Sequence, residues 1–351
     1  MSTNTAPTLQ TIADICGVTK TTVSLALRNQ GRISQGTRDH ISKIAKELGY
    51  RASPLISAHM TMLRTAKAPK YQATIGVVSD WNKSEYLDPK SVPGKHITGI
   101  RKRAKELGYE IDFLTLAEKG MTTRRLVDIL KNRGICSLII PTIISEQGTL
   151  ELPWEEFSAV SIGYSMRAPL LHRVCHDNYS SMRNALKFLK NHGFKRIGLA
   201  MNISDDIRVK SLWSGAYLSS ILNNTEEFSS LEFLTAHWTF ENYRDWLKKD
   251  EPEVVLTINN EIVQWTRKIG YKVPEDLSIV TLANQGSDVT GYDQMPNLVG
   301  EAAVEKVVSL LNQNEVGLPQ KPQTIMTQGH WARGSTLKLK NPSGQFPPSI
   351  Y

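Results

Sequence analysis

The chain has 351 residues, more than one hydrophobic core usually holds, so we expect two or three domains. Its formal net charge is +8, from 42 Lys and Arg against 34 Asp and Glu, which suggests an anionic partner without identifying one. Residues 1–68 carry nine basic and three acidic side chains, so most of the surplus lies in the first fifth of the chain. A surplus confined to one small segment favours nucleic acid as the partner over a role in general solubility.

The cysteines and the apolar segments indicate the compartment. Cys16, Cys136 and Cys175 are far apart and form no CxxC pair, which is typical of reduced thiols in a cytosolic protein. The first eight residues contain no basic residue and no apolar run, so we expect no signal peptide. No later segment approaches the ~20 apolar residues that a membrane helix needs. The sequence therefore predicts a soluble, cytoplasmic protein with no membrane partner.

Residues 8–29 predict two short helices joined at Gly17. Apolar residues recur at helical spacing in both segments, at Leu9, Ile12, Ala13 and Cys16 and then at Val23, Ala26 and Leu27. Gly17 suits the end of the first helix, and Thr19 can cap the second. The remaining face of the second helix carries Lys20, Thr21, Thr22, Ser24, Leu25 and Arg28. A polar and basic face beside a tight turn is typical of a helix-turn-helix in the major groove of DNA, although an ordinary helical hairpin would give the same pattern.

A third helix is predicted from Ser34, its N-cap, to Gly49. Its apolar stripe consists of Ile41, Ile44, Ala45 and Leu48. Residues 7–51 then form one small all-α domain. Ser53 followed by Pro54 predicts the start of another short helix, so we assign residues 52–70 to that helix and a linker.

From residue 71 onward, apolar strand segments alternate with amphipathic helices. This alternation predicts open parallel sheets covered by helices. The series ends near residue 162 and restarts soon afterwards, which indicates a bilobed body with a cleft. A closing strand pair is predicted within residues 322–337, and residues 339–351 are expected to form a disordered tail.

The run T-L-x-x-I-A-x-x-x-G-V-T-x-x-T-V-S at residues 8–24 is followed by Ile33-Ser34, Thr37-Arg38 and Leu48-Gly49-Tyr50. In order and spacing these motifs resemble the signature of the LacI/GalR (lactose-repressor) family of bacterial transcription regulators. In the body, His176-Asp177-Asn178, NHGFKRIGL, VLTINNE and VPEDLSIV resemble family landmarks. The resemblance covers roughly residues 8–338.

The resemblance implies a multidomain fold and an allosteric mechanism. A helix-turn-helix headpiece at 7–51 and a hinge helix with linker at 52–70 would precede a periplasmic-binding-protein-like (type 1) effector domain at 71–338. Within it, the N-lobe would span about 71–162 and 299–322, and the C-lobe about 163–298 and 323–338. The implied function is a repressor that binds a palindromic double-stranded DNA operator as a homodimer and responds to a small-molecule effector, a sugar or another metabolite. The chain lacks the terminal leucine heptad that would argue for a tetramer.

The resemblance also assigns the DNA contacts. The residues implied to face base edges are Lys20, Thr21 and Leu25. The residues implied to contact phosphates are Thr8, Thr22, Ser24, Arg28, Arg32, Ser34 and Thr37. Hydroxyls, basic side chains and helix N-termini are the groups that fix a protein's register on the DNA backbone.

Two DNA-contacting positions depart from the family pattern. Leu25 stands where the family usually has Arg, so it can offer only apolar contact, for instance to a thymine methyl group. In the hinge, His59 stands where the family usually has a Leu that wedges into the minor groove, and Met60 follows it. Either Met60 replaces that wedge or the operator is bent less.

The effector residues depart as well. Sugar-binding members of the family often hold the sugar with an Arg and an Asp. At the corresponding positions this chain has Leu212 or Trp213 in place of the Arg, and Ala283-Asn284 in place of the Asp. The aromatic candidates for ring stacking, which core packing would equally explain, are Trp81, Tyr164 and Trp213. The polar candidates are Asp177, Asn259 and Asn284. The effector is then an unusual sugar, another small molecule, or absent.

The alternative is an α/β enzyme or a ligand-binding protein without a DNA role. The sequence contains no GxSxG, P-loop, GxGxxG or HExxH motif and no paired metal ligands, so we predict neither enzymatic activity, nor a metal, nor a cofactor. The spacing of His172, His176 and His192 matches no metal motif, and surface or capping roles are expected for them.

Overall fold

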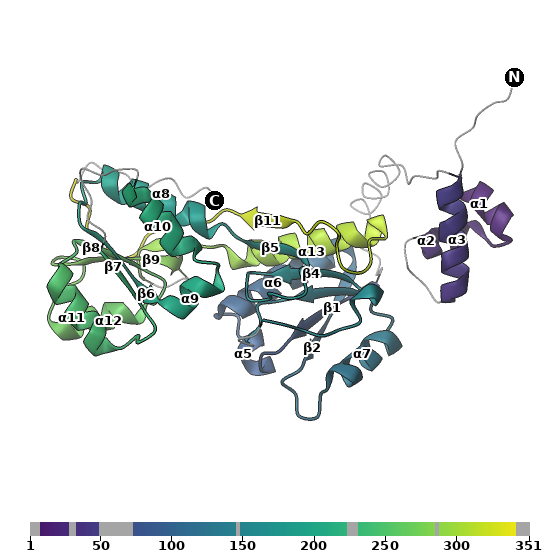
Figure 1. Cartoon of the computed structure of the whole chain (residues 1–351), viewed down its shortest axis with the longest axis horizontal. Coiled ribbons are helices and arrows are strands. Elements are labelled where there is room, and N and C mark those ends of the chain that lie inside the picture. The colour runs from purple at the N-terminus through teal and green to yellow at the C-terminus, as the bar shows by residue number, and fades with distance from the viewer. Residues whose placement is uncertain are drawn as a thin grey trace, which may run out of the picture.

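The computed structural model describes residues 8–27, 33–48, 73–144, 148–222, 231–284 and 288–341. It contains a small helical headpiece and an α/β body of two lobes (Figure 1). Among these residues, no helix is long and apolar enough to cross a membrane.

The headpiece consists of α1 (Leu9–Cys16), α2 (Lys20–Leu27) and α3 (Gln35–Glu47). Gly17 ends α1 with a φ of 65°, as its lack of a side chain allows, and Thr19 Oγ1 accepts a hydrogen bond from Thr22 N at 3.1 Å at the start of α2. Ser34 caps α3 in the same way. The predicted apolar stripes meet in one core, whose fully buried members include Ile12 and Ile41. Gly49 and the predicted hinge helix lie outside the described residues.

The N-lobe is built on a parallel six-stranded sheet in the order β11-β5-β4-β3-β1-β2. Its strands are β1 (Ala73–Ser79), β2 (Tyr109–Thr115), β3 (Ser137–Ile140), β4 (Ser158–Ile162), β5 (His172–His176) and β11 (Thr324–Thr327). Its helices are α5 (Lys83–Leu87), α6 (Val92–Leu107), α7 (Thr123–Asn132), α13 (Pro296–Gln313) and the 3-10 helix η1 (Trp154–Glu156). Helices α6 and α13 share a core on one face of the sheet, and α7 packs on the other.

The C-lobe sheet has the order β12-β10-β9-β8-β6-β7, and only the pair β10–β12 is antiparallel in it. Its strands are β6 (Ile197–Asn202), β7 (Glu232–Thr235), β8 (Val254–Thr257), β9 (Ser278–Asn284), β10 (Gly291–Asp293) and β12 (His330–Ala332). Its helices are α8 (Asn178–Asn191), α9 (Ile203–Arg208), α10 (Leu212–Leu222), α11 (Phe240–Asp250) and α12 (Glu261–Ile269). Helices α8 and α10 cover one face, and α11 and α12 cover the other.

The chain crosses between the lobes at positions that differ from the sequence-based boundaries. Strand β5 pairs with β4, and β11 pairs with β5, so residues 163–176 and 323–327 belong to the N-lobe rather than to the C-lobe. The crossings therefore follow β5, β10 and β11. The predicted closing strand pair is instead one strand in each sheet. Alternating strands and helices look alike in both lobes, so the pattern alone does not say which sheet a strand joins.

The predicted tail begins later than expected. Leu339 packs against the C-lobe core, and Lys340 forms an ion pair with Glu253. These two contacts correct the predicted start at residue 339, while residues 342–351 lie outside the described part of the chain.

Candidate DNA-binding face and interlobe cleft

The outer face of α2 carries the side chains predicted to meet DNA bases. Lys20 and Thr21 are exposed, whereas Val23 and Ala26 point into the headpiece core. Leu25 is half-buried and is not one of the apolar residues packed on that core. An apolar side chain at the surface that contributes little to its own core is available for contact with a partner.

Hydroxyl groups lie at the N-terminus of each headpiece helix. Thr8 Oγ1 accepts from Thr11 N at 3.2 Å, and Ser34 Oγ accepts from Thr37 N at 3.3 Å. Both caps are exposed, and the positive ends of two helix dipoles therefore face solvent beside them. Thr22 and Ser24 are half-buried on α2. The other predicted DNA-contacting side chains, Arg28, Arg32, His59 and Met60, lie outside the described residues.

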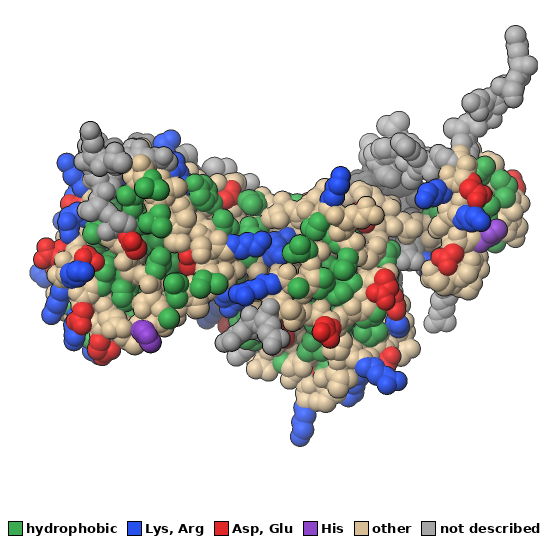
Figure 2. Space-filling model, in the orientation of Figure 1, with side chains coloured by type: hydrophobic (Ala, Val, Ile, Leu, Met, Phe, Trp, Pro, Cys, Tyr) green, Lys and Arg blue, Asp and Glu red, His purple; other side chains and the backbone are tan. Residues whose placement is uncertain are grey.

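A cleft of about 370 Å³ lies where the carboxyl ends of the two sheets face each other. Its N-lobe wall includes His96 and the segment after β4, and its C-lobe wall includes α9 and the segment after β8. On the face that Figure 2 shows, Lys and Arg side chains gather at the junction of the lobes.

Three of the six predicted effector residues line this cleft. Tyr164 follows β4, Asn259 follows β8, and Trp213 lies in α10 with only 2 % of its surface exposed. Trp213 therefore supports the C-lobe core at the same time. Contact of these residues with an effector stays a prediction.

The other three predicted effector residues form hydrogen bonds with the protein backbone. Trp81 Nε1 donates to Thr142 O at 2.8 Å, and Asp177 caps α8 by accepting from Ser180 N at 2.9 Å. Asn284 is buried and donates to Val289 O. Trp81 and Asp177 follow strands and Asn284 ends β9, and the polar atoms of all three bond to backbone groups of the protein instead of lining the cleft.

Two buried histidines of the N-lobe line the cleft and were not predicted as effector residues. Burial lowers the pKa of His96 and of His176 to about 4, so both imidazoles are neutral at pH 7. His176 Nε2 lies 2.7 Å from Ser181 Oγ. The expectation of a surface or capping role is wrong for His176 and also for the buried His172, whose Nε2 lies 2.9 Å from Glu315 Oε1. His192 does cap α8.

Residues of the cleft wall carry buried polar atoms that have no partner in the described part of the chain. Nδ1 of His96 and Oδ1 of Asn259 are buried and accept or donate no hydrogen bond within the part of the chain that the structure describes. Asn259 Nδ2 donates to Asp205 Oδ2 at 3.4 Å. Buried polar atoms are normally paired, so these atoms are suited to a small ligand or to water. The described residues hold no cluster of His, Cys, Asp or Glu suited to a metal ion.

Comparison with known proteins gives the same two-part division. The family model for bacterial regulatory proteins of the lacI family matches residues 8–53, and a periplasmic binding protein-like domain matches residues 186–336. The NTD biosynthesis operon regulator NtdR of Bacillus subtilis is 25% identical over 90% of this chain and 98% of its own. The transcriptional repressor CytR of Escherichia coli is 24% identical over 83% and 84% of the two chains.

Solved structures share the whole fold. The lac repressor dimer bound to operator and the anti-inducer ONPF matches with a TM-score of 0.57 at 19% identity, over 95% of this chain and 100% of the other. A complex of the regulator CelR with cellobiose matches with the same TM-score at 18% identity, over 94% and 99%. The two family models and the sequence relatives, which are transcriptional regulators, show that this chain belongs to the lacI family of bacterial regulatory proteins and is a DNA-binding transcriptional regulator, not an enzyme.

Proposed function

We propose that this regulator is a repressor that binds a palindromic operator as a homodimer, under the control of a small molecule held in the interlobe cleft. The observation that carries this proposal is the exposed face of α2, with Lys20 and Thr21 beside capped helix N-termini, on a chain that also contains a cleft with unpartnered polar groups. One part suits DNA, and the other suits a ligand.

On the DNA side, Lys20, Thr21 and Leu25 contact bases, and hydroxyls at the helix N-termini contact phosphates. The exposed caps Thr8 and Ser34 and the half-buried Thr37 suit phosphate contacts, since the helix dipole favours an anion there. Leu25 offers only apolar contact, so the base opposite it is selected by shape and by a methyl group. A regulator that binds an operator acts in the cytoplasm, where the DNA is.

On the ligand side, the effector is a small uncharged molecule, and sugars are the first class to test. The cleft volume of about 370 Å³ falls within the range of small-molecule sites. Trp213 supplies an apolar wall, while His96 and Asn259 supply neutral hydrogen-bonding atoms. The solved relative with cellobiose supports a sugar, as does the structure with the anti-inducer ONPF.

The operator proposal is tested by binding of the purified full chain to duplexes selected from its own genome. Fluorescence anisotropy should give an affinity that falls steeply with salt, because binding to phosphates releases counterions. The variant Lys20→Ala should weaken binding to the selected palindrome, whereas the matched variant Lys43→Ala, at an exposed site in the middle of α3, should have a smaller effect. Failure of the purified dimer to bind any duplex would contradict the proposal.

The effector proposal is tested by a thermal-shift screen against sugars and other metabolites. A ligand of the folded state raises the apparent melting temperature by mass action. The variant Asn259→Ala should reduce that shift, while the fold is checked by circular dichroism. A ligand whose shift is unchanged by Asn259→Ala binds elsewhere.

A further inference from the structure

The turn between α9 and α10 has a strained backbone. Lys210 and Ser211 are consecutive non-glycine residues with φ of 60° and 54°, in the left-handed region. A side chain makes that region unfavourable, so such residues persist only where surrounding contacts determine their conformation. Arg208, the last residue of α9, and Val209 in the turn also line the cleft.

On the C-lobe side, Asp206 holds this turn in place. Its backbone oxygen accepts from Ser211 N at 2.8 Å. Its buried carboxylate accepts from Ser214 N at 3.1 Å and from Ser214 Oγ at 2.6 Å, which joins the turn to the first residues of α10. The direction in which Lys210 leaves the C-lobe is therefore fixed.

On the N-lobe side, the same turn makes two contacts across the cleft. Lys210 Nζ lies 5.6 Å from the centroid of the Tyr164 ring, within the range of a cation–π interaction. Arg208 Nη2 donates to Ile143 O at 3.4 Å. The Tyr164 ring is itself held by the buried Arg173, whose Cζ lies 5.2 Å from the same centroid. Both partners of the Lys210–Tyr164 contact are thus positioned by their own lobes.

From these contacts we infer that residues 208–211 form an interlobe latch, which holds the cleft closed without an effector. The strained turn is maintained because it directs Lys210 and Arg208 onto the opposite lobe. An effector that enters the cleft then regulates the protein by displacing this latch. In the alternative mechanism, the lobes are apart without effector and the effector draws them together. This regulatory consequence rests on the proposed effector function, whereas the latch itself does not.

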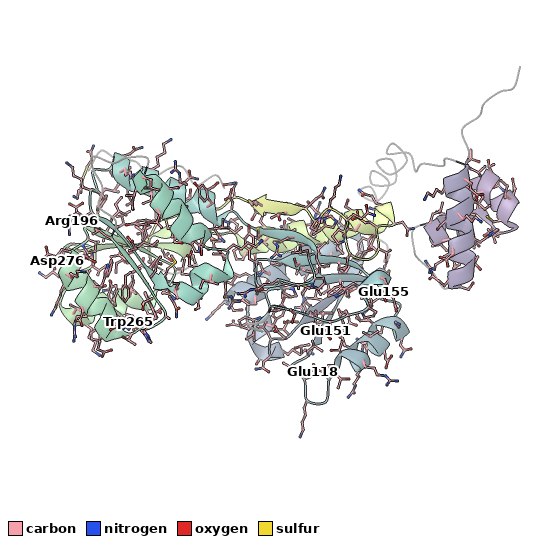
Figure 3. All side chains as sticks on the ribbon, viewed as in Figure 1. Glu118, Glu151, Glu155, Arg196, Trp265 and Asp276 are labelled. Carbon is pink, nitrogen blue, oxygen red and sulfur yellow. The ribbon has the colours of Figure 1, made fainter. Side chains whose placement is uncertain are left out.

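The latch is tested by single-molecule energy transfer in the full chain, with no DNA and no effector present. Labels are introduced by bioorthogonal chemistry at Glu118 and Glu275, which are exposed residues of different lobes. Figure 3 labels Glu118 on the N-lobe, and it labels Asp276, the neighbour of Glu275, on the outer side of the C-lobe. The labelled chain is mixed with an excess of unlabelled chain, so that a dimer carries labels on only one of its protomers. The wild type should be mainly in the state whose label separation matches the structure.

Replacing the cation should open the lobes. The variant Lys210→Met should raise the open-to-closed ratio about two- to fivefold, the factor that corresponds to one exposed cation–π contact. The variant Lys210→Arg keeps the cation and should stay close to the wild type. A matched control is Lys268→Met, because Lys268 Nζ lies 4.6 Å from the Phe240 ring and both residues belong to the C-lobe.

Two results would overturn the latch. The first is a wild-type protein that is mainly open without effector. The second is a ratio for Lys210→Met that equals that of the wild type or of Lys268→Met. Lys210 is exposed, so its replacement leaves the core intact and the test does not depend on rescuing a misfolded protein. Operator affinity is measured separately, so either result leaves the proposed DNA function untouched.

Discussion

The crossing of α6 and α13 beside the cleft depends on two glycines, and Gly300→Ala is the sharpest probe of it. A Cβ atom on Gly300 would lie 2.2 Å from the backbone oxygen of His96, and one on Gly99 would lie 1.9 Å from the backbone oxygen of Asn297. Neither oxygen can move without its helix. The two helices would have to separate by about 1 Å to restore ordinary contact, and overpacking of this kind costs typically about 1–3 kcal/mol.

We therefore expect Gly300→Ala to lower the free energy of unfolding by about 2–3 kcal/mol, near the upper end of that range because the clash is with backbone. Urea titrations followed by circular dichroism measure the loss, and hydrogen exchange in residues 92–107 localises it. The matched control is Gly215→Ala in α10, where an added Cβ meets nothing within 4 Å. That variant should instead be stabilised by about 0.5–1 kcal/mol. Equal effects of the two substitutions would refute the argument from close helix contact.

Two further predictions concern the headpiece and the buried histidines. Replacing Leu25 with Arg should shift the preferred operator toward guanine opposite that position, which selection from random duplexes would show; an unchanged preference would mean that Leu25 does not face a base. Because burial lowers the pKa of His96 and His176 from 6.5 to about 4, the folded state binds fewer protons than the unfolded chain in that interval. The free energy of unfolding should be fully retained above pH 6.5 and fall toward pH 4, by up to about 1.4 kcal/mol per pH unit for each histidine. Denaturant titrations of His96→Leu should show a shallower fall, and equal slopes would contradict this assignment.

The headpiece could be predicted from sequence because its determinants are local. Helical spacing places Ile12, Val23 and Ile41 on faces that meet, and the caps at Thr19 and Ser34 act on amides within three residues. Such signals are complete within a short segment. The same is true of the alternation of strands and helices in the body, because each apolar segment is short and local.

The lobe boundaries and half of the cleft depend on contacts between distant segments. Nothing within residues 172–176 says that β5 joins the first sheet, because that depends on its pairing with β4. Similarly, Asp177 follows a strand as a binding residue would, yet its carboxylate accepts from Ser180 N and Gln328 Nε2. His96 reaches the cleft only because α6 packs on α13, a helix about 200 residues away in the chain.

The distribution of charge in the cleft bears on the kind of ligand that it selects. The cations Arg208 and Lys210 both face atoms of the opposite lobe, Ile143 O and the Tyr164 ring. Among the cleft residues, His96 Nδ1 and Asn259 Oδ1 have no protein partner within the described part of the chain, and both groups are neutral at pH 7. An unpaired buried polar atom costs more free energy than the mean hydrogen bond contributes, so a ligand that pairs both atoms gains over one that pairs neither. Discrimination should then follow the pattern of hydrogen-bond donors and acceptors on the ligand rather than its charge.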